Sequence, residues 1–397
     1  MPVIAQNYGE KMKKLLFING HLNTGGVEKS LLDILQHIDY SQYHVDLLLL
    51  EGRGDYFDQL PSEVSVIFKD LHHTYGGLLQ SMRTCIRTRD NMCLRMRLLF
   101  AAKKLTGNHA LKNAAKILLG SHEYDVGIGF RPGICSDLVA YSVNAKKKFT
   151  WWHHGGMNVD PTKYSEMCGE MDKVAVVSES CKTMLENTCP MIRDKLVCIP
   201  NMLDAANIIA KSKLQNPYCK TDKRILVSVG RLSDEKHFEN AVIAASRLRK
   251  AGITNFEWHI VGNGSEREKI WQAIREYHIE DVVMMDGSQT NPYAYMKQAD
   301  LYVHPSYVES QGLTILEAMA LGTPCVVTKS LGPCEFIRDG ENGLLVDQSP
   351  DALAEGILRM LNDHELYNHI KKNTHCPEQF SPECVMKKIY NVIEDTI

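Results

Sequence analysis

Short apolar runs alternate with longer segments of helical spacing along most of the chain. Such alternation is typical of parallel β-sheets covered by helices, because a parallel strand buried on both faces reads as a continuous apolar run. In the first 200 residues the pattern predicts seven strands, at 14–19, 45–50, 64–68, 125–129, 149–152, 174–177 and 196–199. A glycine-rich turn and a helical run at about 27–38 follow the first strand. The first half is therefore expected to form one doubly wound α/β unit.

The alternation is interrupted once and then begins again. Residues 204–223 are polar, weakly patterned and contain Pro217, which is typical of a connection between domains. Six further strands are predicted at 224–229, 257–261, 282–285, 301–303, 325–328 and 344–346. We therefore expect an α/β protein with two Rossmann-like, doubly wound domains, 1–203 and 204–380, that face a central cleft. A helical run at about 381–397 is expected to pack back on the N-terminal domain.

Length, composition and charge narrow the classes of protein that fit this pattern. A chain of 397 residues usually forms more than one core, and 44% hydrophobic with 23% charged residues is typical of globular proteins. A formal net charge of −3 argues against nucleic acid as the main partner. No apolar run reaches the ~18 residues of a membrane span, and the first ten residues lack the features of a secretory signal. The 12 cysteines include no C-x-x-C pair, so a cytoplasmic protein with free thiols is expected in preference to a disulfide framework or a zinc site.

Residues 81–116 stand out by their charge, with nine basic residues and one acidic residue, Asp90. Four leucines in this stretch are spaced for one face of a helix: Leu94, Leu98, Leu99 and Leu105. One interpretation is an amphipathic element on an anionic membrane surface, which would make the protein peripheral at the inner face of the cell membrane. The other is a pair of helices whose Lys and Arg side chains face water. We favour the second, because a membrane-surface helix usually has a bulkier apolar face.

A glycine-rich loop at 19–28 lies where the first predicted strand ends and the first helix begins. Gly25 and Gly26 let backbone N–H groups approach an anion closely, and the positive end of the helix dipole adds to the attraction. The loop is neither G-x-G-x-x-G nor a Walker motif. A tight strand-to-helix turn and a phosphate-binding loop are equally compatible with it.

Two cations follow the first strand of the second half, in the segment Val229-Gly-Arg-Leu-Ser-Asp-Glu-Lys-His237. Arg231 and Lys236 lie five residues apart across the strand end and the turn. Such a pair can hold a diphosphate, the arginine as a bidentate fork and the lysine as a point charge. Without further context, two solvated cations are the simpler interpretation.

Two carboxylates flank a predicted helix start further along the chain. Glu309 lies in the loop after a predicted strand, and Gly312 can open a helix whose second turn then contains Glu317. This geometry would place one carboxylate near the hydroxyls of a sugar and the other near the 2′ and 3′ hydroxyls of a ribose. The amides of Gly312, Leu313 and Thr314 would form an anion-binding helix start between them. Two glutamates at this spacing are common, so the surrounding sequence has to decide.

That surrounding sequence resembles family 4 of the glycosyltransferases, whose members have the GT-B fold. The clearest likeness is the E-x7-E signature in Glu309-Ser-Gln-Gly-Leu-Thr-Ile-Leu-Glu-Ala-Met-Ala320. The other segments that resemble the family follow its order along nearly the whole chain: 24–28, 177–180, 199–201, 229–236, 260–264, 291–300 and 335–346. The resemblance implies a retaining glycosyltransferase of the bacterial surface-polysaccharide type.

The resemblance also implies a role for individual residues. A nucleotide-sugar donor, with a UDP-sugar favoured over a GDP-sugar, would be bound by Gly25, Gly26, Gly230, Arg231, Lys236, Asn263, Glu309, Gly312, Leu313, Thr314 and Glu317. Glu309 would orient the sugar ring, Glu317 would anchor the ribose, and Arg231 and Lys236 would stabilise the departing diphosphate. The N-terminal domain would bind the acceptor, a saccharide or a lipid-linked saccharide. No Asp-x-Asp motif is present, so no metal and no other cofactor is expected.

A pair of histidines completes the candidate site. Family members often carry a histidine before a glycine at the end of a strand, and His154 fits this pattern because Gly155 follows it. We therefore expect His154 to contact the donor sugar or its phosphate and to take part in catalysis. For an isolated histidine a structural role would be the simpler interpretation. The pair His72 and His73 lacks such a context and is interpreted as surface.

Two departures from the family pattern leave parts of this prediction open. Ser310 and Gln311 stand where many members have Gly-Phe, which puts the identity of the donor sugar in doubt. Residues 56–122 match no segment that we can name. The fold could also serve a nucleotide-sugar epimerase or a phosphorylase-like enzyme, although no lysine placed for pyridoxal phosphate is identifiable. A non-catalytic partner subunit that binds a nucleotide sugar is the remaining alternative, and the intact set of charged residues argues against it.

Overall fold

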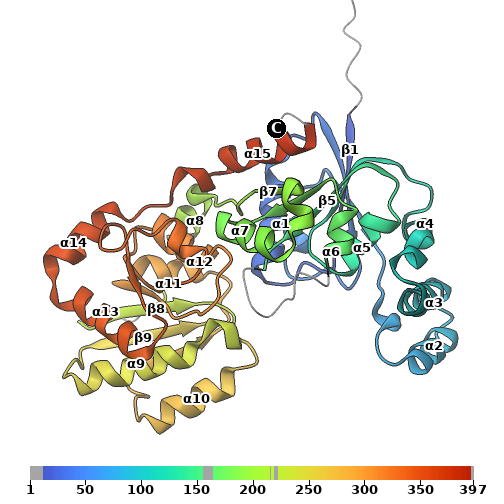
Figure 1. Ribbon diagram of the computed structural model, residues 1–397. Coiled ribbons are helices and arrows are strands. Elements are labelled where there is room, and N and C mark those ends of the chain that lie inside the picture. Colours follow the sequence, from blue (N-terminus) through green and yellow to red (C-terminus); the bar gives the residue numbers. More distant parts are fainter. Residues whose placement is uncertain (1–11, 155–163, 215, 219–221, 395–397) are drawn as a thin grey trace, which may run out of the picture.

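The structure, a computed structural model that describes residues 12–154, 164–214, 216–218 and 222–394, contains two parallel β-sheets (Figure 1). Seven strands form the sheet of the N-terminal domain in the order β3-β2-β1-β4-β5-β6-β7. These strands are β1 (Lys13–Asn19), β2 (Tyr43–Leu49), β3 (Val64–Phe68), β4 (Tyr124–Gly129), β5 (Ala145–Trp152), β6 (Lys173–Val176) and β7 (Leu196–Cys198). Every pair of neighbouring strands in this sheet is parallel.

Six strands form the sheet of the C-terminal domain in the order β10-β9-β8-β11-β12-β13, again with parallel neighbours. They are β8 (Arg224–Val229), β9 (Phe256–Val261), β10 (Val283–Gly287), β11 (Leu301–His304), β12 (Cys325–Thr328) and β13 (Leu344–Val346). All thirteen predicted strands are present, with ends that differ by a few residues. The prediction of two doubly wound, Rossmann-like α/β domains is confirmed.

Helices cover both faces of each sheet, because side chains of a buried parallel strand point alternately to opposite faces. In β1, Leu15 and Phe17 belong to one apolar cluster, whereas Leu16 and Ile18 belong to another. The helices of the N-terminal domain are α1 (Gly26–His37), α2 (Leu78–Arg87), α3 (Asn91–Thr106), α4 (Ala114–Leu119), α5 (Ile134–Tyr141), α6 (Ser165–Gly169) and α7 (Glu179–Thr188). The later helices are α8 (Ala205–Ser212), α9 (Phe238–Lys250), α10 (Arg267–Glu276), α11 (Pro292–Gln298), α12 (Leu313–Ala320), α13 (Pro350–Asn362), α14 (His364–Asn373) and α15 (Pro382–Glu394).

Strand β5 begins before the apolar run that predicted it, and its first half contains the lysines 146–148. These lysines interrupt the hydrophobic pattern, which is why the sequence did not indicate a strand there. In the structure their ammonium groups donate hydrogen bonds to the carboxylate of Asp125 at 2.6 Å and to the carbonyls of Ile393 at 2.7 Å and Ala140 at 2.8 Å. Lysines can thus form part of a buried sheet when their long side chains let the charged ends reach polar partners.

The connection between the two sheets contains a helix that its polar sequence did not indicate. Helix α8 begins after Asp204, whose side chain accepts a hydrogen bond from the backbone N–H of Asn207 at 3.0 Å. This is an ordinary N-cap. Ile208 is buried together with Leu203 in an apolar cluster of the C-terminal domain. Because Ile208 is the one buried apolar side chain of this eight-residue helix, the sequence has no repeated apolar spacing that would indicate α8.

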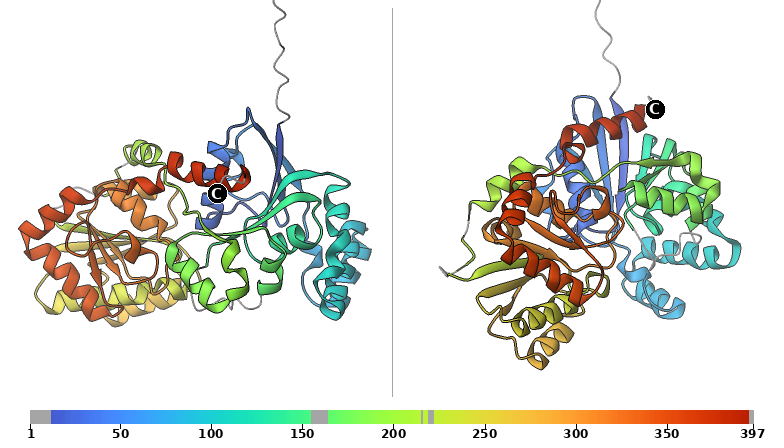
Figure 2. Two further views of the ribbon diagram at one scale, coloured as in Figure 1. Left: turned by 45° about the horizontal axis from the view of Figure 1, so that its top comes forward. Right: turned by 60° about the vertical axis from the view of Figure 1, so that its left-hand side comes forward.

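The last helix lies against the N-terminal domain, far from the C-terminal strands that precede it (Figures 1 and 2). The aromatic ring of Tyr390 stacks on that of Tyr43 with 5.4 Å between the ring centroids. Glu394 accepts a hydrogen bond from the hydroxyl of Tyr43 at 2.7 Å and forms an ion pair with Lys13. Five side chains of α15 are buried in the N-terminal core: Val385, Met386, Ile389, Val392 and Ile393.

Two further properties hold for the described residues. None of their helices is both long and apolar enough to cross a lipid bilayer. The eleven cysteines among them are all free thiols.

We predict that Ile389→Ala lowers the free energy of unfolding by about 2–5 kcal/mol, because the side chain is 3% exposed and its removal leaves a cavity between α15 and the sheet. Lys387→Ala, on the exposed side of the same helix, is the control and is expected to change stability by about 0.5 kcal/mol or less. Urea denaturation measures both values. Equal stability of the two variants would show that the helix does not belong to the N-terminal core.

Candidate active site

The two domains meet through loops that follow the carboxyl ends of strands in both sheets. Gln311, in the loop after β11, accepts a hydrogen bond from the backbone N–H of Asn201 at 2.7 Å and donates one to its carbonyl at 2.9 Å. In a second contact, the backbone N–H of Ser180 donates to the carboxylate of Glu335 at 2.6 Å. Doubly wound domains bind ligands at this edge of the sheet, so the candidate site is expected here.

Both residues that depart from the family pattern contact the other domain. The hydroxyl of Ser310 donates a hydrogen bond to the carbonyl of His153 at 2.6 Å, and Gln311 makes the two bonds to Asn201 described above. Sequence analysis connected these positions only with the identity of the sugar. The structure adds a positional role, because they hold the loop that contains Glu309 against the N-terminal domain.

Glu309 is the centre of a charged cluster in this loop. Its Oε1 accepts hydrogen bonds from Nζ of Lys236 at 2.5 Å and from Nε2 of His304 at 2.6 Å. The side chain is 7% exposed, and burial alone would raise its pKa. The positive charge of Lys236 and the hydrogen bonds outweigh burial and hold the pKa of Glu309 well below its usual range. Glu309 is therefore an ionised, fixed hydrogen-bond acceptor at neutral pH.

His304 and Tyr302 belong to this site although the sequence analysis did not single them out. An ionised carboxylate can only accept, so Nε2 of His304 carries the hydrogen of its bond to Glu309. Nδ1 of His304 lies 3.1 Å from the hydroxyl of Tyr302, which donates to Oγ1 of Thr314 at 2.8 Å. Alternate residues of a strand point to the same face, so the positions of Tyr302 and His304 at the end of β11 were the available signal.

Gly312 is the N-cap of helix α12, so the helix opens where it was predicted to, and Glu317 lies in its second turn. Gly312 has a φ of 87°, a backbone conformation that residues with a side chain rarely adopt, so glycine is favoured there. Glu317 is 8% exposed, and burial raises its pKa to about 7, with Lys29 of α1 opposing the shift. The hydroxyl of Tyr293 donates a hydrogen bond to its Oε1 at 3.3 Å. The surroundings thus lower the pKa of Glu309 and raise that of Glu317.

The glycine-rich loop of the N-terminal domain faces the charged residues of the C-terminal domain. A Cβ atom at Gly25 would lie 3.4 Å from Nη2 of Arg231, and one at Gly26 would lie 3.7 Å from Cδ1 of Leu313. The Arg231 side chain is exposed and forms no ion pair with any described residue. Backbone amides of one domain, a free guanidinium and the start of α12 thus meet at the domain boundary.

Asn263 lies on the exposed turn after β9. Its side chain accepts a hydrogen bond from the backbone N–H of Gly264 at 2.9 Å, and its carbonyl accepts one from Leu232 at 3.0 Å. The latter bond ties this turn to the segment that begins with Gly230. Asn263 therefore shapes the turn beside Arg231, and its contact with a donor stays a prediction.

The two histidines at the end of β5 differ in their surroundings. Burial lowers the pKa of His153 to about 3, and Nε2 of its ring has no hydrogen-bond partner among the described residues. Burial, followed by the charge of Arg131, also lowers the pKa of His154. Both rings are therefore neutral at pH 7. Gly155, on which the choice of His154 rested, lies outside the described residues, so the catalytic role of His154 stays a prediction.

An ion pair joins Arg131, which the sequence did not single out, to Glu28, which ends the family-like segment 24–28 but had been given no role. Glu28, in the first turn of α1, is 3% exposed, and Nδ1 of His21 lies 3.6 Å from its Oε1. Nε of Arg131 is buried without a hydrogen-bond partner in the described part of the chain. These residues follow β1 and β4 and line the N-terminal side of the domain boundary.

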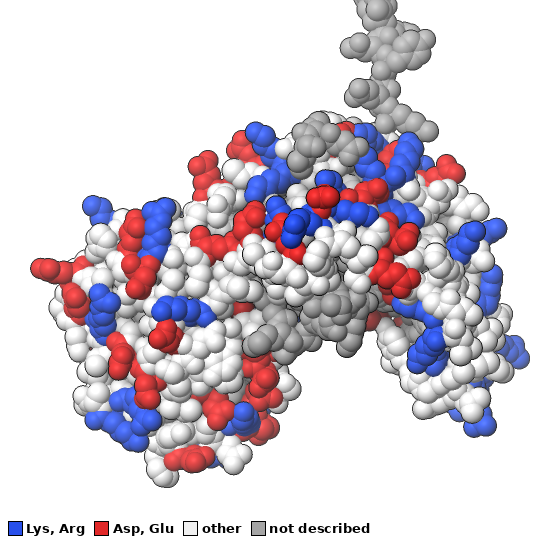
Figure 3. Space-filling view, viewed as in Figure 1, with Lys and Arg blue, Asp and Glu red and all other residues white. Residues whose placement is uncertain are grey.

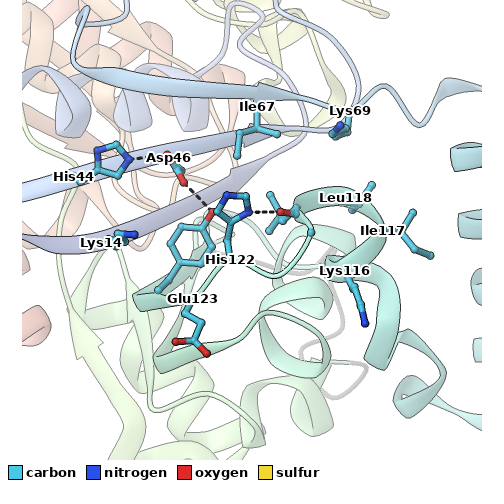
Figure 4. Close-up of a pocket in the computed structure, with 13 residues that line it drawn as sticks. Lys14, His44, Asp46, Ile67, Lys69, Lys116, Ile117, Leu118, His122 and Glu123 are labelled. Carbon is cyan, nitrogen blue, oxygen red and sulfur yellow. Dashed lines mark hydrogen bonds and ion pairs between the residues drawn. The ribbon is translucent and has the colours of Figure 1, made fainter.

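A pocket of about 700 Å³ lies at the opposite end of the N-terminal sheet (Figure 4). It is lined by residues at the amino ends of β1, β2 and β4, among them Lys14, His44 and Tyr124, and also by α4 and the end of β3. Asp46 accepts hydrogen bonds from Tyr124 at 2.9 Å and from His44 at 3.1 Å. Because doubly wound domains place their catalytic loops at the carboxyl ends, this pocket is not the candidate active site.

One group of described side chains has an arrangement that could hold a metal ion. His73, Asp90 and Cys93 offer ligand atoms within 4.8 Å of one another. Asp90 is the N-cap of α3, and its carboxylate already accepts hydrogen bonds from the N–H of Cys93 at 2.9 Å and from Nδ1 of His73 at 3.0 Å. The group connects α3 to the segment before α2 and does not include any of the loops around Glu309. His73, interpreted as surface, is thus a half-buried partner of that cap.

The sequence and the fold are similar to those of known glycosyltransferases. Residues 211–375 match the family model of glycosyl transferases group 1. The lipopolysaccharide core biosynthesis glycosyltransferase LpsE of Rhizobium meliloti is 31% identical over 192 residues, 47% of this chain and 54% of the relative. N-acetyl-alpha-D-glucosaminyl L-malate synthase of Bacillus anthracis is 24% identical over 278 residues, 66% of this chain and 72% of the relative. The match thus spans only about half the length of LpsE.

A solved structure extends the likeness to almost the whole fold. Anabaena Alr3699/HepE, determined in complex with UDP and glucose, has a TM-score of 0.70 at 18% sequence identity, covering 96% of this chain and 99% of that chain. At this identity the similarity establishes the fold, and the paired Rossmann-like domains match the GT-B arrangement of such structures. This chain therefore has the GT-B fold, and its residues 211–375 are similar to the glycosyl transferases group 1 family.

Proposed function

We propose that this protein is a retaining glycosyltransferase that moves a sugar from a nucleotide-sugar donor to an acceptor hydroxyl. The observation that carries the proposal is the convergence of Gly25, Arg231 and the start of α12 at the domain boundary, beside the Glu309–Lys236 pair. Such a site presents positive charge and backbone amides to a diphosphate, and fixed acceptors to a sugar. The group 1 family match and the glycosyltransferase relatives agree with this chemistry.

Each side chain has a role in the proposed reaction. The exposed guanidinium of Arg231 and the ammonium group of Lys236 stabilise the negative charge that develops on the departing nucleoside diphosphate. Glu309 accepts hydrogen bonds from hydroxyls of the donor sugar while the acceptor hydroxyl attacks from the same face. Glu317 accepts from the ribose, and the neutral imidazole of His154 contacts the sugar or its phosphate. No metal ion takes part in this proposal.

The donor is proposed to be a UDP-sugar, since HepE was solved with UDP and glucose and has the same fold. The acceptor is proposed to be a saccharide or lipid-linked saccharide of a cell-surface polysaccharide, since LpsE is named for lipopolysaccharide core biosynthesis. The N-terminal domain would supply the acceptor contacts, with Glu28 and Arg131 at the carboxyl ends of its strands as candidates. Cytoplasmic localisation remains part of the proposal.

Thermal unfolding with a panel of UDP-, GDP- and ADP-sugars tests the proposed donor. A ligand present at about 100 times its Kd adds about 2.7 kcal/mol to the stability of the folded state, which is easily measured as a shift in Tm. We expect a shift with UDP-sugars, and a smaller or no shift with the others. A shift with GDP-sugars alone would overturn the choice of nucleobase, and no shift with any of them would overturn donor binding.

Substitutions at the charged pair test the proposed catalytic roles. We predict that Glu309→Gln and Lys236→Met each lower kcat by about 100- to 1000-fold, because each removes a preorganised charge from the transition state. The products are followed by proton NMR, which reports the anomeric configuration of the transferred sugar and would also reveal an altered nucleotide sugar formed by an epimerase. Full activity of both variants would contradict the proposal.

Stability has to be separated from activity in this experiment. Each single variant leaves one partner of the pair unbalanced, so some loss of stability is expected. The double variant Lys236→Met with Glu309→Gln removes both charges and is expected to unfold near the wild-type Tm while lacking transfer. Glu276→Gln, an exposed glutamate on α10, is the matched control and should retain activity.

Glu317 predicts a pH dependence of donor binding. Burial raises its pKa to about 7, so the carboxylate loses its proton between about pH 6 and 8 and only then accepts two hydroxyl hydrogens of a ribose. We expect the affinity for a UDP-sugar to increase over this range and the Glu317→Gln variant to lack the increase. Calorimetric titration with an intact UDP-sugar is suitable, because its diphosphate does not titrate there. If the affinity of the variant increased by the same factor, a group other than Glu317 would be responsible for the pH dependence.

The same shift has a consequence for stability with the opposite sign. The unfolded chain releases the proton of Glu317 near the ordinary value of 4.5, whereas the folded protein releases it near 7. Between these values the folded state binds more protons, so its stability decreases as the pH rises. Glu317→Gln should remove this decrease, which pH-dependent urea denaturation would show.

A further inference from the structure

Helices α2 and α3 form a hairpin that projects from the N-terminal domain (Figures 1 and 2). Few of its side chains are buried: Ser81 and Cys85 in α2, and Cys93, Met96 and Arg97 in α3. Nε of Arg97 donates a hydrogen bond to the hydroxyl of Ser81 at 2.7 Å and thereby joins the two helices. The remainder of the hairpin surface is open to solvent.

Large apolar side chains lie on this open surface. Leu79 is 72% exposed and Ile86 is 62% exposed, and their spacing of seven residues puts them on one face of α2. Leu98 and Leu105 of α3 are 49% and 86% exposed and are also seven residues apart. Leu94 and Leu99, by contrast, are half-buried against the core, so the four leucines predicted to form one face are divided. Each helix thus presents an apolar strip to solvent.

Basic side chains accompany these strips. Arg83 and Arg87 follow Leu79 by four and eight residues and therefore lie on the same outward face of α2. Of the nine basic residues at 81–116, Lys103 pairs with Asp137, and Arg97 is the buried link described above. The other seven form no ion pair with any described residue: Arg83, Arg87, Arg89, Arg95, Lys104, Lys112 and Lys116.

The one acidic residue of this segment, Asp90, does not neutralise these basic side chains. The carboxylate of Asp90 is engaged by the cap of α3 and by His73. Figure 3 shows mainly Lys and Arg among the charged side chains of the right-hand lobe, where the hairpin lies. Asp and Glu are common on the left-hand lobe, which is the C-terminal domain. The hairpin is thus a region of net positive charge on a protein whose formal net charge is −3.

We propose that the α2–α3 hairpin docks on the surface of an anionic lipid bilayer. The unpaired arginines and lysines would bind the anionic headgroups, and Leu79 and Ile86 would enter the boundary between headgroups and acyl chains. A soluble polyanion would satisfy the charges but would leave the apolar strips in water. The outward apolar strips favour docking on a bilayer over a merely solvated helix pair, the interpretation that the sequence favoured.

Docking by the hairpin would hold the boundary between the domains near the membrane. In Figure 3 the hairpin lobe lies beside the hollow that separates it from the C-terminal domain. A lipid-linked acceptor could therefore reach the protein from the bilayer, which is a consequence that rests on the proposed function. The docking itself does not depend on that reaction and can be measured without it.

Vesicle flotation with the full chain tests this proposal. We expect binding to vesicles of phosphatidylcholine with phosphatidylglycerol, little binding to phosphatidylcholine alone, and release from the former at high salt. Replacing Arg83, Arg87 and Arg95 by Gln should weaken the partition coefficient by about 5-fold for each side chain, on the order of 100-fold in total. Lys250→Gln, Arg275→Gln and Lys372→Gln together make the same change of charge on the C-terminal domain and should have little effect.

A second variant separates a bilayer from a soluble polyanion. Leu79→Ser with Ile86→Ser removes only apolar contacts at exposed positions, so folding should be preserved and Tm checks this. We expect it to weaken vesicle binding while binding to dextran sulfate is unchanged. Equal vesicle binding by this variant and wild type, equal effects of the two sets of charge variants, or equal binding to both kinds of vesicle would each overturn the proposal.

Discussion

The buried charge of Glu309 is the constraint on which the site depends. An ionised carboxylate inside a protein costs several kcal/mol unless hydrogen bonds and an opposite charge compensate it. Lys236 and His304 supply both, and Tyr302 in turn holds His304. The compensation therefore connects the segment after β8, the end of β11 and the start of α12 in one rigid group. A substrate that enters meets an acceptor whose position and charge are already fixed.

This group acts together with the other domain because neither domain contains a complete site. Arg231 faces the glycine loop of the N-terminal domain, and Glu317 is influenced by Lys29 of α1. The hydrogen bonds of Ser310 and Gln311 to the opposite backbone explain how the two halves keep their relative position. The charged residues fit the family pattern, whereas Ser310 and Gln311 depart from it. Residues that depart from the pattern can thus determine how the two halves of the site are aligned.

The fold was predictable because buried parallel strands leave a continuous apolar signal, and all thirteen strands carried it. Local signals failed where a tertiary contact replaces hydrophobicity, as for the lysines at the start of β5 and for α8 with its anchor Ile208. The sequence could propose charged residues for the candidate site only where a motif contains them. Glu28 and Arg131 are 103 residues apart and belong to no quoted pair, so only the structure could bring them together.

The return of α15 to the N-terminal domain means that the chain passes between the domains twice. These two passages touch, since the backbone N–H of Leu203 donates a hydrogen bond to the carbonyl of Phe380 at 2.7 Å. A single linker would let the domains swing and twist in any direction. Two adjacent connecting segments restrict the relative motion of the domains more than a single linker would. The double connection thereby favours a constant alignment of Arg231 with the glycine loop around Gly25.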